Sequence, residues 1–73
     1  MPDYPVLSGE DIIRAFERLG FEWVRQRGSH VVMRRGGSGC VNPLHREVKR
    51  GTLAGIVRQS GVTSDEFIAA LTR

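Results

Sequence analysis

The pattern of apolar and polar positions predicts a helix near the beginning of the chain. Ser8, followed by Asp11 three residues later, is typical of a capped helix start. Gly20 suits the left-handed position at which a helix ends. Between them the apolar side chains recur at intervals of four and three residues and form one stripe, made of Ile12, Phe16 and Leu19. Residues 1–7 contain two prolines and are expected to form a loose lead-in.

Three strands are expected after this helix. Residues 21–27 and 29–35 are rich in aromatic and β-branched side chains, and Gly28 permits a tight turn between them. Residues 36–39, Gly-Gly-Ser-Gly, have the composition of a hairpin turn. A short third strand over residues 40–42 follows, and Pro43 is expected to end it because proline cannot donate to the sheet.

Two further helices are expected in the last third of the chain. Residues 44–50 read as a basic loop, and Thr52 is the expected cap of a second helix that ends at Gly61. Its buried stripe is expected to contain Leu53, Ile56 and Val57. Thr63 and Glu66 form a capping box for a short last helix with an apolar face, made of Phe67, Ile68 and Leu71.

This order of elements predicts a single α+β domain over residues 1–73. Consecutive strands with short connections form an antiparallel three-stranded sheet. The helices are the available cover for one face of that sheet, which leaves the other face free. The order α-β-β-β-α with a short C-terminal helix is that of a two-layer, double-stranded-RNA-binding-like fold. A fold hosts many functions, so this order alone does not identify one.

Other whole-chain features favour a cytoplasmic protein. No apolar run approaches the roughly 20 residues that span a bilayer, and residues 1–7 lack the basic and apolar blocks of a signal peptide. The single cysteine, Cys40, cannot form an internal disulfide, which fits a reducing compartment.

Positive charge is concentrated in the middle of the chain. The net charge is +3, yet residues 23–58 hold eight Lys and Arg residues and a single Glu, whereas the flanks hold three basic and seven acidic residues. Such a patch attracts nucleic acids through phosphate contacts and counterion release. A solvated surface on which arginine maintains solubility explains the composition equally well, so charge alone leaves nucleic-acid binding open.

The candidate chemistry centres on two histidines and excludes several site classes. Cys40 and His45 are too few ligands for a zinc site, and the central segment lacks the paired carboxylates of a metal-dependent nuclease. Residues 36–39 are not followed by the helix and Lys-Ser/Thr pair of a phosphate-binding loop. We therefore expect no metal and no cofactor, and we expect Cys40 to be a small buried side chain.

His30 is the leading candidate for catalysis. It follows Gly28 and Ser29, and two arginines precede and two follow it: Arg25, Arg27, Arg34 and Arg35. An imidazole, with an unperturbed pKa of about 6.5, can move a proton when the 2′-hydroxyl of RNA attacks the adjacent phosphate. Arginines would offset the charge that develops on the phosphorus centre. On composition alone, a histidine on a solvated sheet face is the simpler interpretation.

Three blocks of sequence resemble HicA-type toxins, also called YcfA-like proteins. The first block is Gly20-Phe21-Glu22-Trp23-Val24-Arg25-Gln26-Arg27-Gly28-Ser29-His30, which ends in the Gly-Ser-His motif of that family. The second is Pro43-Leu44-His45 followed by Lys49-Arg50-Gly51-Thr52-Leu53, similar to its Pro-x-His and Gly-Thr-Leu motifs. The third is Ile56-Val57-Arg58-Gln59-Ser60-Gly61-Val62 followed by Glu66-Phe67. The blocks keep the family's order from about Ser8 to Leu71.

The resemblance implies a function as well as a fold. HicA-type toxins are metal-independent ribonucleases (mRNA interferases) of type II toxin–antitoxin systems, and they share the double-stranded-RNA-binding-like fold. The histidine of their Gly-Ser-His motif is catalytic, which implies that role for His30. Their partner is a HicB-type antitoxin that covers the active site. The candidate RNA-binding residues are Arg25, Arg27, Ser29, Arg34, His45, Lys49 and Arg50.

Some assignments stay open on the sequence. Asn42 stands before Pro43 where the family usually has apolar residues, and the turn at 36–39 is unusually rich in glycine. His45 could transfer a proton, contact phosphate or fix its loop, and we favour structural support or substrate binding. Trp23 could stack on a base, but we expect it in the core, because so small a domain needs large apolar side chains inside. The alternative functions are a non-catalytic RNA-binding module of the same fold and a protein-interaction subunit.

Overall fold

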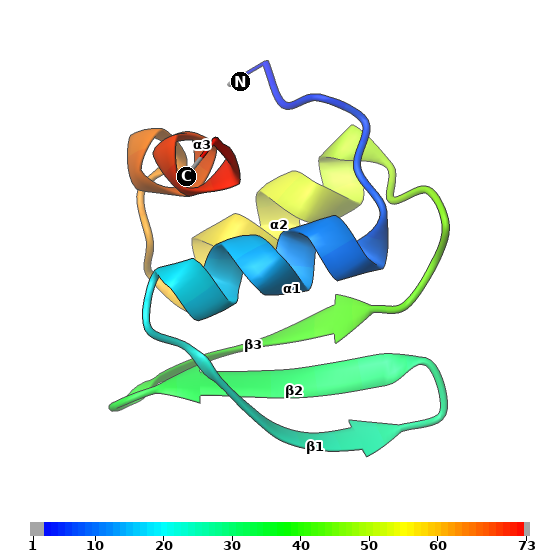
Figure 1. Ribbon diagram of the computed structural model, residues 1–73, viewed down its shortest axis with the longest axis vertical. Helices are drawn as coiled ribbons and strands as arrows, with labels where there is room; N and C mark the ends of the chain where they lie inside the picture. Colours follow the sequence, from blue (N-terminus) through cyan, green and yellow to red (C-terminus); the bar gives the residue numbers. More distant parts are fainter. Residues whose placement is uncertain (1–2, 73) are drawn as a thin grey trace.

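The computed structural model describes residues 3–72 and confirms the predicted α+β order (Figure 1). The sheet is antiparallel, with β2 between β1 and β3. The helices lie together on one side of it, and α3 packs beside α1 (Figure 1). The elements are α1 (Gly9–Arg18), β1 (Glu22–Arg27), β2 (His30–Arg35), β3 (Ser38–Pro43), α2 (Arg50–Ser60) and α3 (Ser64–Leu71).

The helix ends follow local rules, with one exception. The Ser8 hydroxyl accepts a hydrogen bond from the Asp11 N–H (3.1 Å), and Thr63 forms its capping box at the start of α3. Gly61 ends α2 in the left-handed conformation, at φ 78°. The prediction that Thr52 caps α2 is wrong, because the helix begins at Arg50 and Lys49 is its N-cap residue. The Leu53 N–H already bonds to the Lys49 carbonyl oxygen (3.0 Å), which adds a turn before the expected cap.

Strand β2 separates the two faces of the sheet. Val31 and Met33 are buried under the helices, and the alternate residues His30, Val32 and Arg34 therefore lie on the opposite, free face. In β3, Pro43 pairs with His30, so the expectation that the strand ends before this proline is wrong. Because β3 is an edge strand, a residue without an N–H is tolerated there.

Asn42 lies on the covered face of the sheet, opposite Val31. It is fully buried, and its Nδ2 donates to the Cys40 sulfur at 3.5 Å. Its Oδ1 has no hydrogen-bond partner among residues 3–72. The structure thus places a polar side chain at a core position, and nothing in it explains why asparagine is used there.

The prediction that Trp23 belongs to the core is wrong, since its relative exposure is 46%. A β-bulge lies between Trp23 and Arg25, which oppose Met33 and Val32 respectively. The extra residue moves Trp23 to the opposite face from Arg25, although a regular strand would place them on the same face. Trp23 therefore faces the helical layer from the edge strand, where it lines an open pocket together with Ile13 of α1.

The segment before α1 is packed rather than loose, within the part that the structure describes. Tyr4 is buried, and its ring meets the Phe67 ring edge-on at 5.9 Å. Leu7 forms an isolated antiparallel bridge with Val48. The expected lead-in is therefore wrong for residues 3–7, and its first two residues lie outside the described range. This segment binds the connection between β3 and α2.

Candidate active site

The β3–α2 loop, residues 44–49, is held by three backbone hydrogen bonds. The Gly9 N–H, at the start of α1, donates to the His45 carbonyl oxygen (2.8 Å). The Leu44 N–H donates to the Ser29 carbonyl oxygen in the β1–β2 turn (2.6 Å), and the Val48 N–H donates to Leu7 (2.8 Å). Because three separate parts of the chain fix this backbone, the loop presents its side chains from a defined position.

Gly9 is the closest point of approach between α1 and this loop. A Cβ built on Gly9 would lie 2.0 Å from the Pro43 carbonyl oxygen and 3.0 Å from the Leu44 Cα. Both neighbours are backbone atoms, so a side chain at residue 9 would push the helix away from the loop. This contact was not predicted from the sequence. Its only local signal is a glycine in the first turn of a helix, where glycine is disfavoured.

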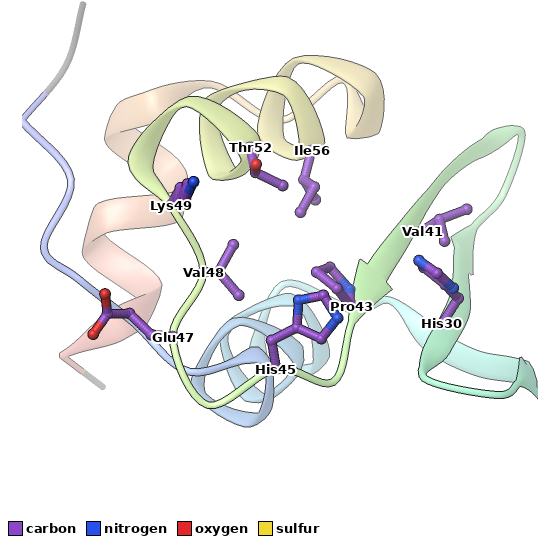
Figure 2. Close-up of a pocket in the computed structure, with 9 residues that line it drawn as sticks. All are labelled: His30, Val41, Pro43, His45, Glu47, Val48, Lys49, Thr52 and Ile56. Atoms are coloured by element: carbon purple, nitrogen blue, oxygen red, sulfur yellow. The ribbon is translucent and has the colours of Figure 1, made fainter.

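A pocket of about 360 Å³ lies where the sheet, the β3–α2 loop and the start of α2 meet (Figure 2). His30 of β2 and His45 of the loop both line it, with Pro43 between them in the view of Figure 2. Lys49 and Thr52 border it at the beginning of α2. The remaining lining residues are Val41, Glu47, Val48 and Ile56. The pocket thus combines an apolar wall with two imidazoles and an ammonium group.

His30 also belongs to a basic sheet surface. Its cross-strand partners are Pro43 on β3 and Arg27 on β1, and such partners have Cβ atoms about 4.5–5.5 Å apart on the same face. Arg25 opposes Val32, so Arg25 and Arg34 share this face with His30. We call the four exposed side chains Arg25, Arg27, His30 and Arg34 the basic face.

One acidic residue borders the basic face. Glu22 opposes Arg34 across β1 and β2, and among residues 3–72 no ion pair joins their side chains. The three arginines therefore outnumber the acids on this surface, and their positive charge extends from the pocket across the sheet. An exposed imidazole at the boundary between an arginine-rich sheet and a pocket is well placed to meet a bound phosphate.

The predicted site residues therefore fall into three groups. His30, His45 and Lys49 meet at the pocket, and Arg25, Arg27 and Arg34 continue from it along the sheet. Ser29 and Arg50 do not line the pocket. The Arg50 Nε donates to the Tyr4 carbonyl oxygen at 2.6 Å, which ties the N-terminal segment to α2.

Arg35, which also follows His30 in sequence, makes contacts that hold the fold together. Its Nη1 donates to the Leu19 carbonyl oxygen at the end of α1 (2.9 Å), and its guanidinium stacks over the Phe21 ring at 4.8 Å. Adjacent residues of a strand face opposite sides, so Arg34 points to the free face and Arg35 to the helices. Of the two arginines after His30, only Arg34 is part of the basic face.

Thr52 and Ile56 are pocket residues for which other roles are expected from the sequence. Thr52 was expected to cap α2 and Ile56 to be buried in its apolar stripe. Ile56 is buried as expected, and Thr52 lies inside α2 because the helix begins before it. Both residues also border the pocket. The sequence signal for this shared position is their spacing of four residues, which places both side chains on one face of the helix.

Cys40 has no part in this site. It is buried, and burial raises the pKa of its thiol above the ordinary value, with only partial compensation from the Asn42 hydrogen bond. A thiol with a raised pKa stays protonated and is a poor nucleophile. Within residues 3–72, no three His, Cys, Asp or Glu side chains are grouped to hold a metal ion. None of the helices in that range has the length and apolar character of a membrane-spanning segment.

Fold and site together define a small basic α+β domain with a two-histidine pocket beside an arginine-rich sheet face. The family model of the HicA toxin of bacterial toxin–antitoxin systems matches residues 9–62, well over half of the chain. The chain therefore belongs to the HicA toxin family, and it is the toxin of a pair that includes an antitoxin. The match runs from α1 to the residue after Gly61 and includes both histidines and Lys49. No curated protein sequence matches the chain.

Proposed function

We propose that the protein is an mRNA interferase, a metal-independent endoribonuclease that uses His30 as an acid–base catalyst. The observation that carries this proposal is the position of His30, which is exposed, lines the pocket and has Arg27 as its cross-strand partner. Membership of a toxin family supports it, because cleavage of messenger RNA is a way for so small a protein to arrest growth.

The basic face would bind the RNA backbone on either side of the scissile bond. Arg25, Arg27 and Arg34 are exposed on the same sheet surface, and guanidinium groups recognise phosphate through paired hydrogen bonds. Arg27 is the one of these arginines that is the cross-strand neighbour of His30, and it would stabilise the charge that develops on the reacting phosphate. Ser29 and Arg50 do not line the pocket and would contact flanking phosphates.

The natural partners follow from this assignment. The substrate is mRNA, which places the protein in the cytoplasm, and a HicB-like antitoxin would neutralise the toxin by covering the pocket and the basic face. His30 supplies the proton transfer that a metal-bound water provides in other nucleases, so the reaction needs no cofactor.

Cleavage of a fluorophore-labelled RNA by purified protein in the presence of EDTA tests the proposal. We expect His30→Gln to lower kcat by about 10²–10⁴-fold, the usual contribution of a general acid–base residue. Circular dichroism and RNA affinity should stay close to wild type, because His30 is exposed and Gln preserves a polar side chain.

Two results would overturn the assignment. Undiminished cleavage by His30→Gln in chelator would remove His30 from the reaction. RNA binding by the wild-type protein without any cleavage, at every RNA tested, would favour the non-catalytic RNA-binding module. Arg35→Gln is the matched control, since Arg35 follows His30 on the same strand and faces the helices.

A further inference from the structure

We propose that His45 is the second proton-transfer residue of the reaction and works with His30 across the pocket. This inference rests on the proposed ribonuclease function and assigns the partner that His30 needs. Both imidazoles line one pocket, although they lie fifteen positions apart in sequence and on different elements (Figure 2).

The imidazole of His45 is free to act on a ligand. It is exposed, and among residues 3–72 it has no hydrogen-bond partner. The loop is fixed by main-chain groups instead, including the carbonyl oxygen of His45, which accepts from Gly9. A loop-fixing role therefore belongs to the backbone at residue 45, and the ring is left at the pocket without a structural task.

The chemistry calls for two groups of this kind. In RNA cleavage the 2′-oxygen forms a bond to phosphorus while the bond from phosphorus to the 5′-oxygen breaks. One neutral imidazole takes the 2′-hydroxyl proton, and one imidazolium gives a proton to the departing 5′-oxygen. The products are a 2′,3′-cyclic phosphate and a 5′-hydroxyl. The pair of histidines holds one proton before and after the step, and exchange with water restores the original arrangement.

The other pocket groups fit a phosphate between the two rings. The Lys49 ammonium supplies positive charge at the pocket, and the Thr52 hydroxyl is a hydrogen-bond donor on α2. Glu47 is the carboxylate of this lining, and Figure 2 shows its side chain directed away from the space between the histidines. The charged groups that line a pocket with His45 are Lys49 and Glu47 on the side of His30, and Glu10 and Arg46 on the side of α1. Arg27 is the charged cross-strand partner of His30.

The test compares His45→Gln with wild type on an RNA and on the same RNA carrying a 5′-bridging sulfur at the scissile position. A thiolate leaves without protonation, so the sulfur substrate bypasses the acid and not the base. We expect His45→Gln to lower kcat on ordinary RNA by about 10²–10⁴-fold and to remove one limb of a bell-shaped pH profile. The sulfur substrate should restore cleavage by whichever histidine variant has lost the acid, and by only that one.

The controls separate this inference from the proposed function. Arg46→Gln, a neighbour on the same loop that does not line the pocket, should keep the kcat of wild type at saturating RNA. A His45→Gln kcat within about twofold of wild type, a loss confined to KM, or sulfur rescue of neither histidine variant would each overturn the role of His45. If His30→Gln is inactive in those same assays, the ribonuclease proposal stands although the inference about His45 fails.

Discussion

Replacement of Gly9 by alanine tests the contact that positions the β3–α2 loop. Glycine is among the worst helix formers, so the change adds up to about 1 kcal/mol of stability where space allows. At residue 9 the new Cβ would meet the Pro43 carbonyl oxygen at 2.0 Å, and real Cβ atoms do not approach other heavy atoms more closely than 3.0 Å. Helix and loop must therefore separate by roughly an ångström.

The cost of that separation exceeds the gain from helix propensity. Overpacking of this kind costs about 1–3 kcal/mol, and weakening of the hydrogen bond from Gly9 to the His45 carbonyl oxygen costs a further 0.5–1.5 kcal/mol or so. Against a helix-propensity gain of up to about 1 kcal/mol, the net loss of stability is about 0.5–4.5 kcal/mol. In a domain of this size each kcal/mol lowers Tm by about 4–8 °C.

Urea and thermal unfolding followed by circular dichroism measure this loss, with Gly51→Ala as the matched control. Gly51 also lies in the first turn of a helix, and a Cβ there would meet no atom within 4 Å. We expect Gly51→Ala to be as stable as wild type or more stable, and Gly9→Ala to be clearly less stable. A Gly9→Ala protein with the stability of Gly51→Ala would refute the argument that backbone contact requires glycine at residue 9.

Three further predictions follow from the fold and the basic face. Trp23→Ala should cost about 1–2 kcal/mol in urea unfolding, since its side chain is half-exposed, whereas a core tryptophan would cost about 3–5 kcal/mol. Arg27→Ala should reduce the slope of log K against log salt for single-stranded RNA by about 0.7, the value for one lost phosphate contact, and Arg35→Ala should leave the slope unchanged while lowering Tm. Hydrogen bonds from the Thr63 backbone and side chain lower the pKa of the Glu66 carboxyl group. The folding stability that the ionised carboxylate contributes is therefore present above the ordinary carboxyl pKa, and it is lost as the pH falls through the lowered pKa. Unfolding measured across acid pH should therefore show a steeper loss in wild type than in Glu66→Gln, and equal slopes would contradict this.

Much of the fold could be predicted because its signals are local. Ser8 and Thr63 cap helices through their own hydroxyl groups, and Gly61 ends one through its own φ angle. The errors arose where a distant part of the chain decides the outcome. Tyr4 is ordered by Phe67 of the last helix. Trp23 is exposed because a bulge in an edge strand changes its face, which apolar periodicity does not reveal.

The same distinction applies to the candidate site. His30, His45 and Lys49 could each be selected by residue type and motif, since each lies in a block that resembles one family. Their meeting in one pocket depends on where the β3–α2 loop is fixed, and this is decided by hydrogen bonds to Gly9, Ser29 and Leu7. Pairwise sequence spacing contains no information on such contacts, so the meeting of the two histidines at one pocket emerges only from the structure.

The chemical nature of the ends produced from RNA tests the central claim most directly. Purified wild-type protein is incubated with a defined RNA in EDTA, and the fragments are analysed by mass spectrometry, with His30→Gln treated in parallel. We predict fragments that end in a 2′,3′-cyclic phosphate and begin with a 5′-hydroxyl, and no such fragments from His30→Gln. Fragments with 5′-phosphate and 3′-hydroxyl ends, or the same cyclic products from His30→Gln, would contradict a histidine-based ribonuclease.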